Sequence, residues 1–139
     1  MIRRLLALAA AFPVIAAAQA APQQPAPPPE VFIRSPADGA TVPATFTVVF
    51  GLRNYGVAPA GVTGVPNAGH FHLIVDVAPP AVGQIIPKDS VNIHFGGGQI
   101  ETKVTLKPGK HTLRAVLGDF EHRVTQKEFI SKPITVIVK

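Results

Sequence analysis

The stretch HFHLIVDV at residues 70–77 alternates between two sets of side chains. Successive side chains of a β-strand point to opposite faces, so this alternation predicts a strand. We expect the aliphatic and aromatic set to point into a core: Phe71, Leu73, Val75 and Val77. The other set shares the opposite face: His70, His72, Ile74 and Asp76. The strand therefore presents two imidazoles on one side.

Further alternating segments flank this strand, and Pro or Gly residues that favour turns separate them. They cover residues 31–33, 46–52, 100–106, 111–118 and 134–138. In the segment 100–106 we expect three side chains to point inward: Ile100, Val104 and Leu106. No segment shows a helical period with caps. The pattern predicts an all-β fold, with an immunoglobulin-like antiparallel β-sandwich as the closest fit and a small barrel as the alternative.

The N-terminus has the three parts of a secretory signal peptide. Two arginines precede an apolar run at residues 5–17, and Ala18-Gln19-Ala20 then offers a cleavage site. The run is shorter than the about 20 apolar residues that a membrane-spanning helix needs. We therefore expect residues 1–20 to be a signal peptide and the mature protein to begin at Ala21. The expected location is periplasmic or secreted, with no membrane span after cleavage.

Residues 21–29 read APQQPAPPP, which predicts an extended Pro-rich linker before one domain at residues 30–139. The sequence has no Cys, which excludes disulfides, thiolate metal ligands and cysteine nucleophiles. The formal net charge of +5 includes two arginines of the signal region, and the remaining charges are scattered. Nucleic-acid binding requires a clustered basic patch, so we do not expect a nucleic-acid partner.

The predicted topology brings histidines from distant segments to one end of the sandwich. In the immunoglobulin arrangement, the strand at 70–77 runs antiparallel beside the strand at 111–118. The start of the first strand therefore lies beside the end of the second. This register gathers four side chains: His70, His72, Asp119 and His122.

His94 reaches the same end by a different route. The turn at Pro108-Gly109 lies at the far end of the sandwich, so the strand at 100–106 begins at the near end, shortly after His94. Two long loops, residues 53–69 and 78–99, border this end, and loops of such length are typically functional or disordered. His111 opens its strand at the far end and is excluded.

A metal site is the first interpretation of this convergence. Imidazole and carboxylate groups suit Zn²⁺ or copper, and His-x-His on a strand lets one segment supply two ligands. The candidate metal ligands are His70, His72, His94, His122 and Asp119. Asp76 shares the histidine face but lies toward the far end, so it ranks second. The alternative is structural: imidazoles that hydrogen-bond loop carbonyls and brace the Gly-rich loops.

The sequence shows few features of a catalytic site. Its three serines lie outside any nucleophile elbow, and no carboxylate pair has the spacing of an acid–base couple. The glycine run at residues 96–98 lacks the remainder of a phosphate-binding loop and predicts a loop with positive φ. Three functions remain open. The first is an exported non-catalytic domain that binds copper, zinc or a small ligand, the second an envelope module with a protein partner, and the third a metal-dependent enzyme.

Several blocks of this sequence resemble a family of short exported bacterial proteins, catalogued as a domain of unknown function. They are HFHLIVD at 70–76, HFGGGQ at 94–99, PGKHTL at 108–113 and LGD at 117–119. The resemblance covers about residues 35–138 and implies shared His and Gly blocks without an established activity. Members of that family tend to have further His where Phe71 and Arg123 stand here.

The segment SPADGATV at residues 35–42 resembles the opening of periplasmic copper-resistance proteins of the CopC kind. Those proteins are immunoglobulin-like sandwiches, so the resemblance implies the same fold. They place a copper-binding His at the mature N-terminus, which this sequence lacks, so the resemblance does not extend to that copper site.

Overall fold

The structure, a computed structural model, describes residues 25–139. The predicted signal peptide at 1–20 and the first four residues of the linker lie outside the described residues. No helix within residues 25–139 is long and apolar enough to cross a bilayer. The strands are β1 (Glu30–Ser35), β2 (Ala40–Val42), β3 (Thr45–Arg53), β4 (Gly56–Val57), β5 (Ala68–Val75), β6 (Asn92–His94), β7 (Glu101–Thr105), β8 (Gly109–Gly118) and β9 (Ile134–Val138). A 3₁₀ turn, η1 (Lys127–Phe129), precedes β9.

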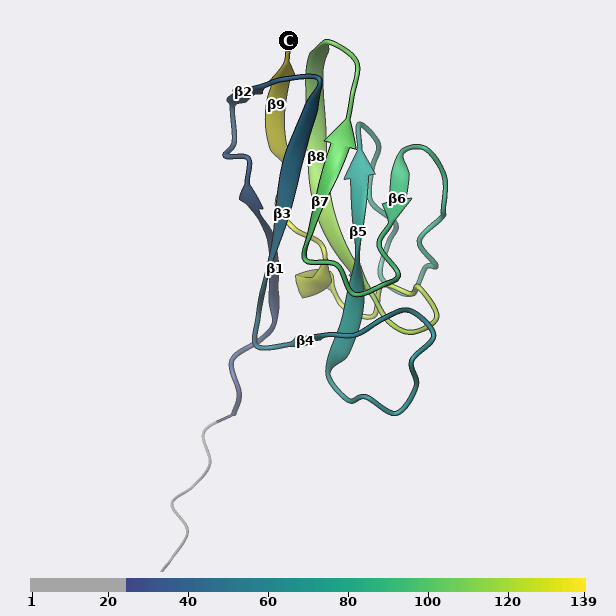
Figure 1. The fold of residues 1–139 in the computed structure, drawn as a ribbon. Coiled ribbons are helices and arrows are strands. Elements are labelled where there is room, and N and C mark those ends of the chain that lie inside the picture. Colours follow the sequence, from purple (N-terminus) through teal and green to yellow (C-terminus); the bar gives the residue numbers. More distant parts are fainter. Residues whose placement is uncertain (1–24) are drawn as a thin grey trace, which may run out of the picture.

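These strands form two sheets, which Figure 1 shows as a sandwich. The smaller sheet has the order β1-β3-β7, and the larger has the order β2-β9-β8-β5-β4, with β6 paired to β5. Neighbouring strands are antiparallel except for the β2–β9 and β4–β5 pairs. The predicted all-β, immunoglobulin-like sandwich is confirmed, with the strands β5 and β8 as antiparallel neighbours.

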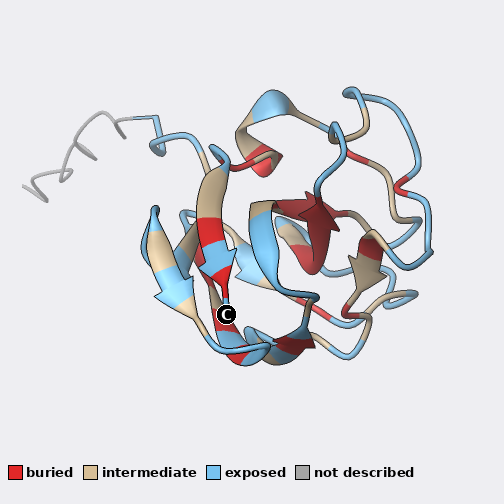
Figure 2. Ribbon diagram, turned by 90° about the horizontal axis from the view of Figure 1, so that it is seen from above, coloured by how far each residue is buried: buried red, intermediate tan, exposed pale blue. Residues whose placement is uncertain are grey.

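The core lies between the two sheets and is made by the alternating positions of β3, β5, β8 and β9. The rings of Phe50 and Phe71 stack across it with centroids 4.6 Å apart. Each large apolar side chain that leaves water in this way contributes about 1.5–3 kcal/mol. Figure 2 colours the buried segments red. The side chains that carry the core from both sheets are Phe46, Val48, Phe50, Phe71, Leu73, Val75, Leu113, Ala115, Leu117 and Val136.

The register of β5 against β8 is the feature that positions the candidate site. Pairing runs from His70 opposite Gly118 to Val75 opposite Leu113. This confirms the predicted antiparallel pairing, and it places the start of β5 at the end of β8. The turn before Gly109 lies at the far end, together with His111.

The second face of β5 is buried as well, by loops rather than by a sheet. Ile74 packs there against Ile86, Val116 and Val124. The loop that follows β5 and the loop that follows β8 are joined by backbone hydrogen bonds, including Ile86 N–H to the His122 carbonyl at 2.8 Å. The alternation of β5 therefore separates two buried faces, and the histidines share the one that the loops cover.

Two inward positions predicted from alternation are wrong. Ile100 precedes β7 at the edge of the smaller sheet, where its side chain is 57% exposed. Val77 is 42% exposed because β5 ends at Val75 and Asp76 leaves the extended conformation with φ 58°. The strand cannot continue through a residue with positive φ, so the period of two stops there.

Candidate metal centre

Four imidazoles meet at one end of the larger sheet. Two come from β5, one from β6 and one from the turn after β8: His70, His72, His94 and His122. The six pairs of ring centroids are 4.7–5.7 Å apart. The structure thus brings together all four histidines that the sequence placed at this end. We call them the histidine cluster.

Strand pairing places two members of the cluster opposite each other. In the β5–β6 register, His72 lies directly opposite His94. The sequence placed His94 at the correct end but in a loop, because a three-residue strand shows no recognisable period. His70 lies opposite Gly118, the last residue of β8.

His122 reaches the cluster from a tight turn that Asp119 holds in place. The Asp119 carboxylate accepts hydrogen bonds from the backbone N–H groups of Glu121 and Arg123, at 2.9 and 2.8 Å. His122 itself has φ 67°, which is uncommon for a residue other than glycine. Asp119, a predicted ligand, therefore lies beside the cluster with its carboxylate oxygen Oδ1 engaged in the turn.

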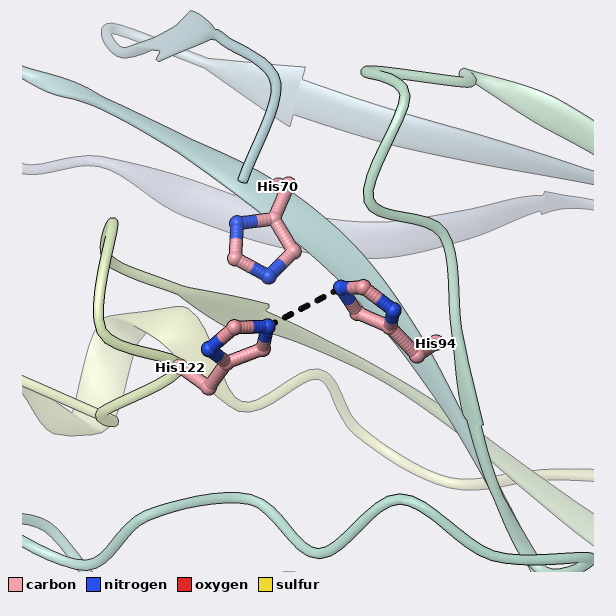
Figure 3. Close-up of side chains that lie close together, drawn as sticks. All are labelled: His70, His94 and His122. Atoms are coloured by element: carbon pink, nitrogen blue, oxygen red, sulfur yellow. Dashed lines mark hydrogen bonds between the residues drawn. The ribbon is translucent and has the colours of Figure 1, made fainter. Parts of the chain in front are cut away.

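The ring nitrogens of the cluster face one another. His70 Nε2 lies 3.1 Å from His72 Nε2, and His94 Nε2 lies 3.1 Å from His122 Nε2. Figure 3 shows His70, His94 and His122 with one nitrogen each turned toward a common point. The ligand atoms of these three all lie within 4.8 Å of one another. A zinc ion bound to nitrogens at about 2.0–2.1 Å would hold neighbouring ligand atoms about 3.3–3.4 Å apart, so binding would require the widest of these separations to shorten by about 1.4–1.5 Å.

His111 shows what a bracing histidine does in this fold. Its Nδ1 lies 2.6 Å from Asp76 Oδ2 and its Nε2 lies 2.8 Å from the Lys107 carbonyl. Within residues 25–139, by contrast, no ring nitrogen of the histidine cluster hydrogen-bonds a carbonyl. The Nδ1 atoms of His70 and His72 are buried and have no hydrogen-bond partner among the described residues.

The environment keeps His70, His72 and His94 uncharged near neutral pH. Burial, reinforced by the neighbouring imidazoles, lowers the pKa of His70 to about 4 and that of His72 to about 3. Burial is also the main reason why the pKa of His94 is lowered, with His122 and Lys88 acting in the same direction. Neutral imidazole carries the lone pair that binds a metal, so these rings are in the ligand form.

Two glycines make room for the rings, a role that sequence reasoning missed. A Cβ at Gly96 would lie 2.7 Å from His94 Nε2, and one at Gly118 would lie 3.2 Å from His72 Nε2. The run at 96–98 was expected to need positive φ, but within it only Gly98 has this conformation, at φ 75°. The sequence offers only a glycine two residues after His94, and its role becomes visible once the position of the ring is known.

A cavity of about 380 Å³ borders the histidine cluster at His70. Its wall is formed mainly by the loop before β5, which Ala60 N–H anchors to the Gly96 carbonyl at 2.8 Å. Apart from His70 its lining is uncharged and largely apolar: Ala58, Pro59, Val62, Gly64, Val65, Pro66, Ala68, Gly69 and Phe120. A small molecule that reached the cluster from this side would pass apolar side chains.

Comparison with known proteins gives one match. The family model described as "Domain of unknown function (DUF4399)" matches residues 48–139, a range that includes the whole histidine cluster. No curated protein and no solved structure gives a significant match. The resemblance of residues 35–42 to copper-resistance proteins is therefore not shown.

Proposed function

The chain belongs to the DUF4399 family, whose model covers more than half of it, and we propose that its domain binds a zinc ion. The core ligands are His70, His94 and His122, whose ligand atoms lie within 4.8 Å of one another. The observation that carries this proposal is the direction of the ring nitrogens, which face one another rather than backbone carbonyls.

The energetics of the cluster favour a functional role over bracing. Two fully buried imidazoles, His70 and His72, each leave a nitrogen without a partner in the described part of the chain. An unsatisfied buried polar atom costs about 1–3 kcal/mol. A fold that needed these rings only for bracing would gain more from apolar side chains, or from the carbonyl contact that His111 makes. The unpartnered atoms are Nδ1, on the side of each ring away from the Nε2 that faces the cluster, so this cost argues against bracing and does not by itself identify the metal.

The arrangement of the rings around a common point suits a tetrahedral zinc ion. In a square-planar arrangement, preferred by Cu²⁺, diagonal pairs are about 1.4 times as far apart as neighbouring pairs. In a tetrahedron all six distances are equal. The six ring-centroid distances span only 4.7–5.7 Å, so the rings are spaced almost evenly, whereas the ligand nitrogens are 3.1 Å apart in two pairs and up to 4.8 Å apart among His70, His94 and His122. Zinc has no preference from d electrons and is usually tetrahedral in proteins.

The proposed location is outside the cytoplasm. The support is the charged region, apolar run and Ala-Gln-Ala site in residues 1–20. A thiol-free ligand set suits that setting, because imidazole ligands are not lost by oxidation as thiolates are. The proposed function is therefore that of an exported zinc-binding domain.

Calorimetric titration of untagged protein, purified from the periplasm, tests the proposal. We expect one zinc ion to bind per chain at pH 7.5, and elemental assay to find zinc in the purified protein. His94→Ala and His122→Ala should weaken this binding by about 100-fold or more, since disturbing only the residues around a ligand already costs about 10–100-fold; both side chains are partly exposed, so these variants should fold. His111→Ala is the matched control and should bind as the parent does. Binding of neither zinc nor copper would show that the cluster is structural.

A further inference from the structure

We infer that His72 is the fourth ligand, so that the zinc centre is a closed tetrahedron of four imidazoles. This inference rests on the proposed function and deepens it. A closed centre has no position for substrate or reactive water, and it therefore separates a structural or carrier role from a metal-dependent enzyme.

The two short nitrogen–nitrogen distances can serve as opposite edges of one tetrahedron. One edge joins His70 and His72, the other joins His94 and His122, and both are 3.1 Å long. The two edges share no atom and together contain all four rings. Zinc bonds of about 2.0–2.1 Å give a tetrahedral edge of about 3.3–3.4 Å, so each short pair need open by only a few tenths of an ångström, while the two pairs must approach each other from separations of up to 4.8 Å.

The side chain of His72 is surrounded by the other rings of the cluster and by backbone. Its side chain is fully buried, and its ring lies 4.9 Å from His70 and 5.0 Å from His94 between centroids. Gly118 borders its Nε2, where a Cβ would stand only 3.2 Å away. The neighbouring backbone thus lacks a side chain at the point where the Nε2 atom of His72 turns toward the other rings.

A closed shell has a chemical consequence. Catalytic zinc sites keep three protein ligands and leave the fourth position to water or substrate, whereas structural sites fill all four positions. An open site in this fold could take an anion through the cavity that borders His70. With His72 bound, an anion has no vacant position on the ion, even if it enters that cavity.

Cobalt substitution and azide separate these possibilities in the full mature chain. Co²⁺ replaces zinc and reports its ligands in visible absorption. We expect azide to leave the spectrum of the parent protein unchanged. His72→Ala should open one position, so azide should change its spectrum, and free imidazole should restore the parent spectrum. Ile74→Ala is the matched control: it truncates a buried side chain on the same face of β5 outside the cluster and should remain insensitive to azide.

Three results would overturn the inference while leaving the proposed function intact. They are an azide response in the parent protein, a His72→Ala spectrum identical to the parent, or a His72→Ala protein that binds cobalt but ignores azide. If His72→Ala does not fold, zinc-edge X-ray absorption of the parent protein decides between four imidazoles and three imidazoles with an oxygen ligand. Absence of both cobalt and zinc binding in the parent protein would instead refute the proposed function.

Discussion

Replacing Gly96 by Ala should displace a zinc ligand without altering any ligand. A Cβ at this position would lie 2.7 Å from His94 Nε2, with the neighbouring Cε1 closer still. Ordinary van der Waals contact begins at about 3.4 Å, so the His94 ring must move by about 0.7 Å or more. Metal–ligand distances tolerate only about 0.2 Å, so His94 should lose its bond to zinc.

The expected loss of affinity is large and the expected loss of stability is small. Changes that merely disturb the residues around metal ligands weaken binding about 10–100-fold, and displacement of a ligand should cost at least as much. Gly96 does not have positive φ, so Ala is compatible with its backbone. Ala in place of Gly also restricts the unfolded chain, a gain of about 0.4–1 kcal/mol that offsets part of the local crowding.

Calorimetry with zinc and urea unfolding of the metal-free protein measure the two quantities separately. Gly97→Ala is the matched control, since its Cβ would approach only the amide of Gln99, at 3.0 Å, and this exposed side chain can move away. Zinc binding of parental strength in Gly96→Ala would refute the position assigned to His94. A stability loss of several kcal/mol would show that Gly96 maintains the fold rather than the site.

Three further predictions concern stability. Zinc at about 100 times its dissociation constant should stabilise the domain by about 2.7 kcal/mol, visible as a rise in Tm that EDTA reverses; an unchanged Tm would contradict binding to the native state. In the metal-free protein, the folded state holds the pKa of His70 at about 4 and that of His72 at about 3. The unfolded state takes up protons below about pH 6.5, so stability should fall between pH 6.5 and 4, and urea midpoints at pH 7, 6 and 5 should decrease in that order. Hydrogen bonds to Asp76 and the Lys107 carbonyl raise the pKa of His111. The contribution of protonated His111 to the free energy of unfolding is therefore full below about pH 6.5 and is lost as the pH rises through the raised pKa. NMR titration should show this raised pKa and its decrease in Asp76→Asn; an unchanged titration would refute the pairing.

The part of the site that could be predicted from the sequence is the part that depends on strand register. Alternation in β5 and β8, combined with the immunoglobulin strand order, places His70 beside the end of β8. It thereby brings His122 near His70. The period of two and the turn before Gly109 are sufficient for this placement. The same two features also place His111 correctly at the other end of the sandwich.

The remainder depends on local packing that has no periodic signal. The carboxylate of Asp119 has a ligand's chemistry, but its Oδ1 atom accepts two backbone hydrogen bonds and holds the turn of His122. The pairing of β6 with β5 sets His94 opposite His72, and three residues are too few to reveal a strand. The space at Gly96 and Gly118 is visible only once the rings are in place.

The positions of the ligands along the chain suggest why such a domain would use a metal ion. The sequence has no Cys, so no disulfide can tie its long loops to the sandwich. The cluster joins β5, β6 and the turn after β8, and its pair His94 and His122 is 28 residues apart. A crosslink between distant segments stabilises a fold by restricting the unfolded chain, and more so when it closes a long loop. One zinc ion bound to these segments would fix both loops that bury the outer face of β5. Metal binding and closure of that face are then the same event, so protease cleavage between residues 76 and 91 should slow when zinc binds. Equal cleavage rates with and without zinc would show that the loops close independently of the ion.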